Sequence, residues 1–219
     1  MRRWPRIGAL CKQYDVIVVS DEIHCDLTKP GTEYIPFASV DDTCRDISVT
    51  CIAPTKTFNL AGLQTAAVYA ENSILHHRMW RQLNTDEVAE PNAFAIQATI
   101  AAFQYGEEWL DELREYVEKN KQYVTEFLQE KIPLIHPVAG DATYLMWLDC
   151  RKITESGRQF VKFIRKTSGL YVSGGNQYGR GGEGFLRVNV ATSKLVVEDG
   201  MQRLYESVDA WLKEEKISK

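Results

Sequence analysis

Residues 50–64 read TCIAPTKTFNLAGLQ, and Lys56 stands near the centre of this stretch. An apolar run rich in β-branched residues ends at Pro54, and the lysine follows two residues later. A turn of small residues then leads into a second apolar run. We expect this pattern to place the amine at the end of a buried strand instead of out in water.

A second strand end lies upstream of this stretch. Residues 16–20 read VIVVS and run directly into Asp21. A short apolar run bounded by polar residues is typical of a parallel strand that is buried on both faces. Further short apolar runs, separated by helices or loops, predict an α/β sheet. The sequence therefore predicts two strand ends, one with a carboxylate and one with an amine.

An amine and a carboxylate at two strand ends suggest a cofactor with one aldehyde and one basic ring nitrogen. Pyridoxal phosphate needs both partners, a lysine that forms a Schiff base and an acid beside its ring nitrogen. Two simpler interpretations remain open at this level. Lys56 could be a solvated surface lysine, as most lysines after a strand are, and Asp21 could be an ordinary helix N-cap.

Several stretches of the chain carry a family resemblance. They are 20–27 (SDEIHCDL), 35–39 (IPFAS), 53–64 (APTKTFNLAGLQ), 105–110 (YGEEWL), 142–149 (ATYLMWLD) and 184–189 (GFLRVN). Together they resemble fold-type I pyridoxal-phosphate enzymes of the class I/II aminotransferase superfamily. Within it they most resemble the MalY/PatB-type carbon–sulfur β-lyases, which are cystathionine β-lyase-like. The resemblance covers essentially the whole chain, and Asp21, Lys56 and Arg187 occur in the family's order.

The resemblance implies an α/β fold, with the C-terminal portion of a large mixed-sheet domain followed by a small α/β domain. A long helix is predicted over 107–131, because apolar residues recur there at amphipathic spacing. In the family such a helix links the domains, so we expect a partial large domain at 1–119 and a small domain at 120–219. The family's N-terminal part, with its phosphate loop and ring-stacking aromatic residue, would be missing from a fragment or truncated product.

The resemblance also implies cofactor-binding roles. Lys56 would form the Schiff base and, once released by substrate, act as general base. Asp21 would keep the pyridine nitrogen protonated. Thr55 would donate to the phosphate or else cap a helix. His24 would lie near the phenolic oxygen, where many aminotransferases have tyrosine and the lyase branch has histidine, or it would be a structural histidine. Gln64 stands where aspartate-type aminotransferases usually have a phosphate-binding arginine.

Arg187 is the candidate substrate-binding residue. It lies in an otherwise apolar strand, where an arginine is costly unless it is paired. A guanidinium matches a carboxylate well, and the family uses this position for the substrate α-carboxylate. The alternative is a structural ion pair with an aspartate or glutamate.

The function implied is a pyridoxal-phosphate-dependent carbon–sulfur β-lyase. It would cleave cystathionine- or cysteine-type substrates to pyruvate, ammonia and a thiol. An aminotransferase would use the same residues, and an inactive truncated fragment is the third reading. The implied partners are a small amino-acid substrate and, in an intact version, a second copy in a homodimer.

Composition limits the other possibilities. The formal net charge is −4 with dispersed lysine and arginine, which does not favour nucleic-acid binding. No apolar stretch approaches about 18 residues, so no membrane span is expected. The five cysteines include no C-x-x-C pair, which fits a reducing, cytoplasmic setting and gives no metal site. Nearly half of the residues are hydrophobic, enough for a folded core.

Periodicity predicts the remaining elements. The Gly-rich stretch 174–184 reads as a mobile loop at an active-site entrance. Apolar stripes predict helices around 7–11, 74–83, from 91–92 onward, 158–166 and 194–213. Apolar runs predict strands at 47–52, 64–70, 143–148, 170–173 and 185–190.

Overall fold

The computed structural model of the protein describes residues 3–217. The chain divides into two compact units, and the division falls between Leu113 and Arg114. This point lies inside the long helix α6 (Glu107–Lys131). The division expected at 119/120 falls within the same helix.

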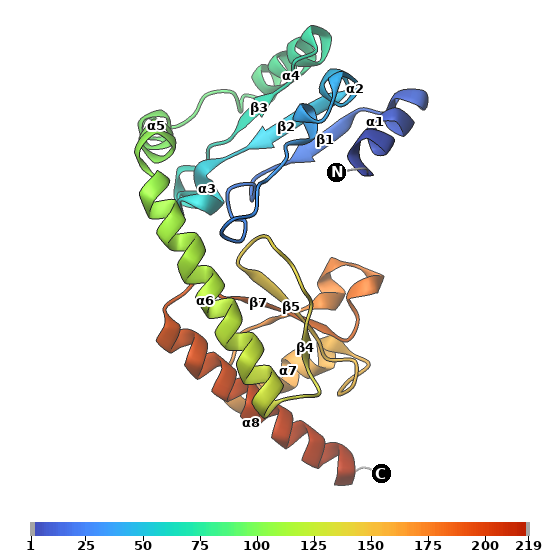
Figure 1. Ribbon diagram of the computed structural model, residues 1–219, viewed down its shortest axis with the longest axis vertical. Helices are drawn as coiled ribbons and strands as arrows, with labels where there is room; N and C mark the ends of the chain where they lie inside the picture. Colours follow the sequence, from blue (N-terminus) through green and yellow to red (C-terminus); the bar gives the residue numbers. More distant parts are fainter. Residues whose placement is uncertain (1–2, 218–219) are drawn as a thin grey trace. The chain divides into compact units, whose positions relative to one another are not determined.

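The first unit is built on a three-stranded mixed sheet. Its order is β1 (Val18–Asp21), β2 (Ser48–Ile52) and β3 (Ala67–Tyr69), and Figure 1 shows β2 between the other two. β1 and β2 are parallel, whereas β3 is antiparallel to β2. The helices of this unit are α1 (Arg3–Gln13), α2 (Asp42–Asp46), α3 (Pro54–Thr57), α4 (Ser73–Thr85) and α5 (Ala95–Tyr105), with short 3-10 helices η1 (Phe37–Ser39) and η2 (Ala61–Leu63).

Two small apolar clusters hold this sheet. One contains Phe37, Cys44 and Ile47 with the half-buried Val18 of β1 packed against it. The other forms around Val49 of β2 with residues of β3 and α4. Val18 pairs with Ser48 and Val19 with Val49, so the two clusters lie on opposite faces of the sheet, and each excludes water from part of one face.

The expectation of a strand buried on both faces at 16–20 is wrong. Along β1 the residues alternate between half-buried and exposed, and Val19 is 67% exposed. β1 is an edge strand of the sheet, and only the side carrying Val18 packs on the described core. A strand with one covered face shows this alternation, because successive side chains point to opposite faces.

The second unit contains a four-stranded antiparallel sheet with the order β4-β5-β7-β6. Its strands are β4 (His136–Pro137), β5 (Leu145–Asp149), β6 (Ser173–Gly174) and β7 (Phe185–Asn189). Its other elements are α7 (Gly157–Ser168), α8 (Lys194–Ile217) and the 3-10 helices η3 (Gly175–Tyr178) and η4 (Arg180–Gly182). Figure 1 shows α7 and α8 near this sheet, and the two helices pack against each other.

The two faces of this sheet differ in burial. Met146, Leu148, Leu186 and Val188 point to one face and are buried, whereas the residues between them are only half-buried. The buried residues join a core that includes Phe160 of α7 and the apolar face of α8. In α6, the buried Asn120 donates to the carbonyl oxygens of Val190 and Thr192, and so ties the helix to the loop after β7.

Most predicted elements are confirmed, with shifted ends. The helix predicted over 107–131 has those bounds, and the predicted α/β class holds. The observed strands are shorter than predicted, and the strand expected at 170–173 forms only at Ser173–Gly174. α5 begins at Ala95, three residues after the predicted start. Within residues 3–217, no helix combines the length and apolar character needed to cross a membrane.

Candidate functional site at the ends of two parallel strands

Asp21 and Lys56 lie at the same edge of the first sheet. Asp21 is the last residue of β1 and pairs in register with Cys51 of β2. β2 ends one residue later, and Ala53 leads into α3, which carries Lys56. Because β1 and β2 are parallel, their carboxyl ends meet at one edge, which is the usual place for ligands in such sheets.

Asp21 takes part in a turn and caps no helix. Its Oδ1 accepts a hydrogen bond from the backbone N–H of Ile23 at 3.3 Å, and residues 23–26 form a turn. The helix N-cap alternative is therefore wrong. The Asp21 side chain is exposed, so its carboxylate is accessible to a ligand.

The backbone that carries Lys56 is firmly anchored. The neighbouring Thr57 is fully buried, and its hydroxyl donates to Oδ2 of Asp26 at 3.0 Å. The next residue, Phe58, packs its ring on Phe103 of α5 and on Trp109 of α6, with centroids 5.5 Å and 5.8 Å away. These contacts fix the turn between β2 and η2.

The Lys56 side chain itself is exposed in this structure. The expectation that its amine is kept out of water is therefore wrong for the residues described. The reason is local: α3 is a single turn at the sheet edge, and its buried members are Pro54 and Thr57 on either side of the lysine. Lysine then extends from the surface of the turn, where its amine can meet a ligand.

Downstream of Lys56, Asn59 and Gln64 adopt left-handed backbone conformations. Asn59 has φ 55° and Gln64 has φ 49°. Such conformations cost energy for residues other than glycine, and they concentrate at functional sites. The segment that follows α3 thus departs from regular backbone geometry at two positions.

His24 lies close to both charged residues. The pKa of His24 is lowered first by burial and next by the positive charge of Lys56, while the negative charge of Asp21 acts in the opposite direction. Three residues from β1, the following turn and α3 are therefore close enough to interact electrostatically. A histidine with a lowered pKa stays neutral near pH 7.

This arrangement predicts a pH-dependent stability. Because the pKa of His24 is lower in the folded state, the unfolded state binds more protons as the pH falls below about 6.5, so stability is lost on acidification. Replacing His24 with glutamine should shrink the difference between the urea midpoints at pH 7.5 and pH 5.5. The exposed His76 of α4 provides the matched control, and an equal effect of His76→Gln would refute the assignment.

Thr55 has no capping role. The N-cap of α3 is Ala53, which makes no side-chain cap hydrogen bond, and Thr55 is half-buried inside the helical turn. The alternative that Thr55 caps a helix is therefore wrong. Its hydroxyl lies one residue from Lys56, on the turn that follows β2.

Two supporting carboxylates were missed by sequence reasoning. Glu22 is buried, and its Oε1 accepts hydrogen bonds from the hydroxyl of Ser20 at 2.9 Å and from the N–H of Phe37 at 3.1 Å. Asp26 accepts from Thr57 and so joins the turn after β1 to the lysine turn. Both residues lie within the stretch 20–27, but their partners are distant in sequence and no local pattern marks them.

The cysteine in this turn is a poor nucleophile. Burial, with the nearby Asp26 carboxylate, raises the pKa of Cys25 to about 12. A thiol with that pKa is almost fully protonated at neutral pH, and the thiolate is the reactive form. Lys56 is therefore the better candidate for covalent chemistry at this edge.

Arg187 lies in the second unit, on the half-buried face of its sheet. It pairs in register with Trp147 of β5 and Ser173 of β6. Its guanidinium lies over the ring of Tyr178, 4.4 Å from the ring centre. Burial raises the pKa of Tyr144, and the positive charge of Arg187 opposes this rise, so the two groups are near one another.

No carboxylate neutralises Arg187 in the part of the chain that the structure describes, since none lies within ion-pair distance of its guanidinium. The structural ion pair considered for this position is thus not observed there. A cation held on an aromatic ring remains able to bind a ligand carboxylate through its planar fork of donors.

The site has the donors for an organic cofactor and lacks those for a metal. Residues 3–217 contain no group of three or more His, Cys, Asp or Glu side chains placed to hold a metal ion. The first unit instead brings together an accessible amine, a carboxylate, a neutral imidazole and a hydroxyl at one sheet edge. This donor set suits a ligand with an electrophilic carbon, a basic ring nitrogen and an anionic group.

Comparison with known proteins identifies relatives of this chain. The Aminotransferase class I and II family matches residues 2–204. The chain is 40% identical over 208 residues to cystathionine beta-lyase PatB of Bacillus subtilis (strain 168), covering 93% of this chain and 54% of that protein. It is 30% identical over 202 residues to Protein MalY of Escherichia coli (strain K12), covering 92% and 51%.

Solved structures agree with these relatives. Cystalysin from Treponema denticola, whose crystal structure contains a pyridoxal 5'-phosphate cofactor, matches with a TM-score of 0.91 at 27% identity, covering 95% of this chain and 53% of that one. The chain spans about half the length of the curated relatives it matches. Because the family match extends over nearly the whole sequence, the chain belongs to the class I and II aminotransferase family.

Proposed function

We propose that the protein is a pyridoxal-phosphate-dependent carbon–sulfur β-lyase. Its substrate would be a cystathionine- or cysteine-type amino acid with sulfur on the β-carbon. The Cβ–S bond breaks, the sulfur leaves as a thiol, and water converts the remainder to pyruvate and ammonia. The observation that carries the proposal is that Asp21, His24 and Lys56 lie close together at one edge of the sheet. The chain is also 40% identical to a cystathionine beta-lyase.

The residues at this edge fit the cofactor one by one. Bound pyridoxal phosphate supplies an aldehyde and a protonated ring that withdraws electrons from the substrate. The exposed amine of Lys56 can bond to the aldehyde carbon and later move the substrate's α-proton. The Asp21 carboxylate can hold the proton on the ring nitrogen. The Thr55 hydroxyl can donate to the phosphate, and the neutral His24 can lie beside the phenolic oxygen.

Arg187 would bind the substrate's α-carboxylate. Arg187 is half-buried, its guanidinium lies over the ring of Tyr178, and no carboxylate in residues 3–217 forms an ion pair with it. Charge-assisted, bidentate pairs between arginine and a carboxylate are among the stronger hydrogen-bonded contacts in proteins. This role is consistent with the position of Arg187 on the open, half-buried face of the sheet.

Replacing Arg187 with alanine should weaken substrate binding. We expect KM for L-cystathionine to rise by about 10- to 100-fold, the loss of a hydrogen-bonded charge pair worth roughly 1.5–3 kcal/mol. Arg187→Lys keeps the charge but loses the planar fork, and should recover only part of the affinity. Steady-state kinetics over a range of substrate concentrations measure both. Arg180→Ala, a change at an exposed arginine of η4, should leave KM unchanged. A normal KM in Arg187→Ala would refute the role.

Transamination is the second candidate, since the family includes aminotransferases. Both reactions use the same residues, but a transaminase returns the amino group to a keto acid. The test is pyruvate release from L-cystathionine in the presence of pyridoxal phosphate, with and without an added keto acid. Release without the keto acid supports the lyase, whereas strict dependence on the keto acid supports transamination. No turnover in either condition would contradict both.

We further propose that the enzyme works in the cytoplasm as a homodimer. All five cysteines are free, which fits a reducing compartment. β1 exposes Val19, and Ile17, just before the strand, is also exposed, so one face of the sheet carries apolar surface at this edge strand that a second subunit could cover. Sedimentation of the protein with cofactor tests the assembly, and a monomer at micromolar concentration would rule the dimer out.

A further inference from the structure

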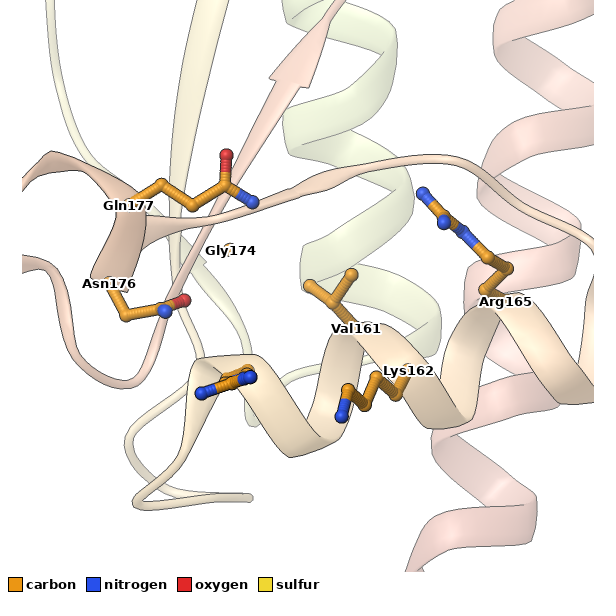
Figure 2. Close-up of a pocket in the computed structure, with 7 residues that line it drawn as sticks. Val161, Lys162, Arg165, Gly174, Asn176 and Gln177 are labelled. Atoms are coloured by element: carbon orange, nitrogen blue, oxygen red, sulfur yellow. The ribbon is translucent and has the colours of Figure 1, made fainter.

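A basic pocket lies in the second unit, and none of the residues assigned above lines it. Its volume is about 280 Å³, and one wall is α7 while the other is formed by β6 and η3. Figure 2 shows Val161, Lys162 and Arg165 on the helix, opposite Asn176 and Gln177. This wall includes part of the Gly-rich stretch that was expected to be a mobile loop, and here it forms short 3-10 helices.

Three positive charges face this pocket from a single helix. Arg158, Lys162 and Arg165 line it and are spaced by four and three residues, so they share one side of α7. Among the residues that the structure describes, none of the three forms an ion pair, and no acidic side chain lines the pocket. Like charges at these spacings repel one another, and a bound anion would relieve the repulsion.

The positions of two arginines sharpen this argument. Arg158 lies in the first turn of α7, where the helix dipole disfavours a cation, and that turn contains no acidic residue. Arg165 is held in place because its guanidinium lies 3.8 Å from the centre of the Tyr171 ring. The charge of Arg158 is therefore unfavourable unless an anion binds beside it, and the guanidinium of Arg165 is already held in one orientation.

The wall opposite α7 carries two side-chain amides that can donate hydrogen bonds, and Gly174 leaves space for the Asn176 amide. Figure 2 shows the side chains of Asn176 and Gln177 extending from η3 on the side of the pocket opposite α7. Gly174 is buried between them and the helix, and a Cβ at this position would lie 2.6 Å from Oδ1 of Asn176 and 3.4 Å from Cγ2 of Val161. A side chain at 174 would therefore displace the Asn176 amide.

We propose that this pocket binds a small phosphorylated ligand through its phosphoryl group. Guanidinium groups and an ammonium can neutralise the charge of a phosphoryl group, and the two amides can donate to its remaining oxygens. The lining includes no aromatic ring on which a nucleobase could stack. The contacts thus favour recognition of the phosphoryl group itself. The proposal does not rest on lyase activity.

Calorimetric titration with inorganic phosphate tests the proposal, with potassium chloride added to keep ionic strength constant. The wild-type protein should give saturable binding. Arg158→Gln and Lys162→Gln should each weaken it by about tenfold or more, since each removes a charge-assisted contact. Gly174→Ala should also weaken binding while every charge is retained.

Lys166→Gln is the matched control. Lys166 lies on the same helix and is exposed, but it does not line the pocket, so its loss should leave the affinity for phosphate within twofold of wild type. Circular dichroism confirms that each variant is folded. Absence of saturable binding in wild type would overturn the proposal, as would equal weakening by Lys166→Gln, which would indicate nonspecific attraction only.

Discussion

Lys56→Ala is expected to eliminate the proposed β-lyase activity, with a fall in kcat of about 10³-fold or more. The loss combines the covalent bond to the cofactor with the proton transfer at the substrate α-carbon, and proton transfer by a positioned group alone typically contributes about 10²–10⁴-fold. The variant should also lose the near-visible absorption of lysine-bound pyridoxal phosphate. Pyruvate release and absorption spectra of the purified protein measure the two effects.

The controls for this variant separate chemistry from charge. Lys56→Arg keeps a positive charge beside His24 but has no nucleophilic amine, so it should be as inactive as the alanine variant. Lys29→Ala removes an exposed lysine from the same unit and should retain activity. Substantial turnover by Lys56→Ala, with the absorption band intact, would show that a different amine binds the cofactor.

Asp21→Asn is expected to lower kcat by about 10²–10³-fold, the range seen when one preorganised electrostatic contact is removed from an active site. The amide can still accept from the N–H of Ile23, so the turn after β1 should survive. What is lost is the negative charge that we propose keeps the ring nitrogen protonated. Kinetics with L-cystathionine give the rate, and the unfolding midpoint reports on the fold.

The prediction for Asp21 differs from a structural effect in a measurable way. A merely structural role would lower stability and cofactor content together with the rate. We expect instead that Asp21→Asn still binds pyridoxal phosphate covalently, with a shifted absorption maximum, while turnover falls. Asp42→Asn, the same chemical change at an exposed residue of α2, should have neither effect. An active Asp21→Asn would remove this residue from the mechanism.

Long periodic elements could be predicted from the sequence alone. The bounds of α6 follow from apolar residues repeating over several turns, because each repeat independently favours the same helix face. The burial of the strands is harder to predict, because a short apolar run does not reveal whether one or both faces of the strand are covered. β1 shows the difference, because Val18 packs on the core while Val19 is exposed.

For the candidate functional residues, too, some features could be predicted from the sequence and others could not. The order of Asp21, Lys56 and Arg187 was visible because the motifs around them are local. The contacts that support them join residues far apart in the chain, such as the hydrogen bond from Thr57 to Asp26 and the stacking of Arg187 on Tyr178. Nothing in the local sequence specifies such pairs, because they depend on how the elements pack.

The exposure of Lys56 shows a further limit. Sequence reasoning could place the lysine after a strand, but not the depth of the turn that carries it. In α3 the buried positions go to Pro54 and Thr57, which leaves the lysine amine at the surface. Burial therefore does not account for the reactivity toward an aldehyde that we propose for this amine.

The attachment site of the cofactor tests the central claim most directly. The protein is incubated with pyridoxal phosphate, reduced with borohydride to make any lysine linkage permanent, digested, and mapped by mass spectrometry. We predict that the phosphopyridoxyl group is found on the peptide containing Lys56, in near-stoichiometric amount. A group spread over several surface lysines, or concentrated on a different one, would contradict the account.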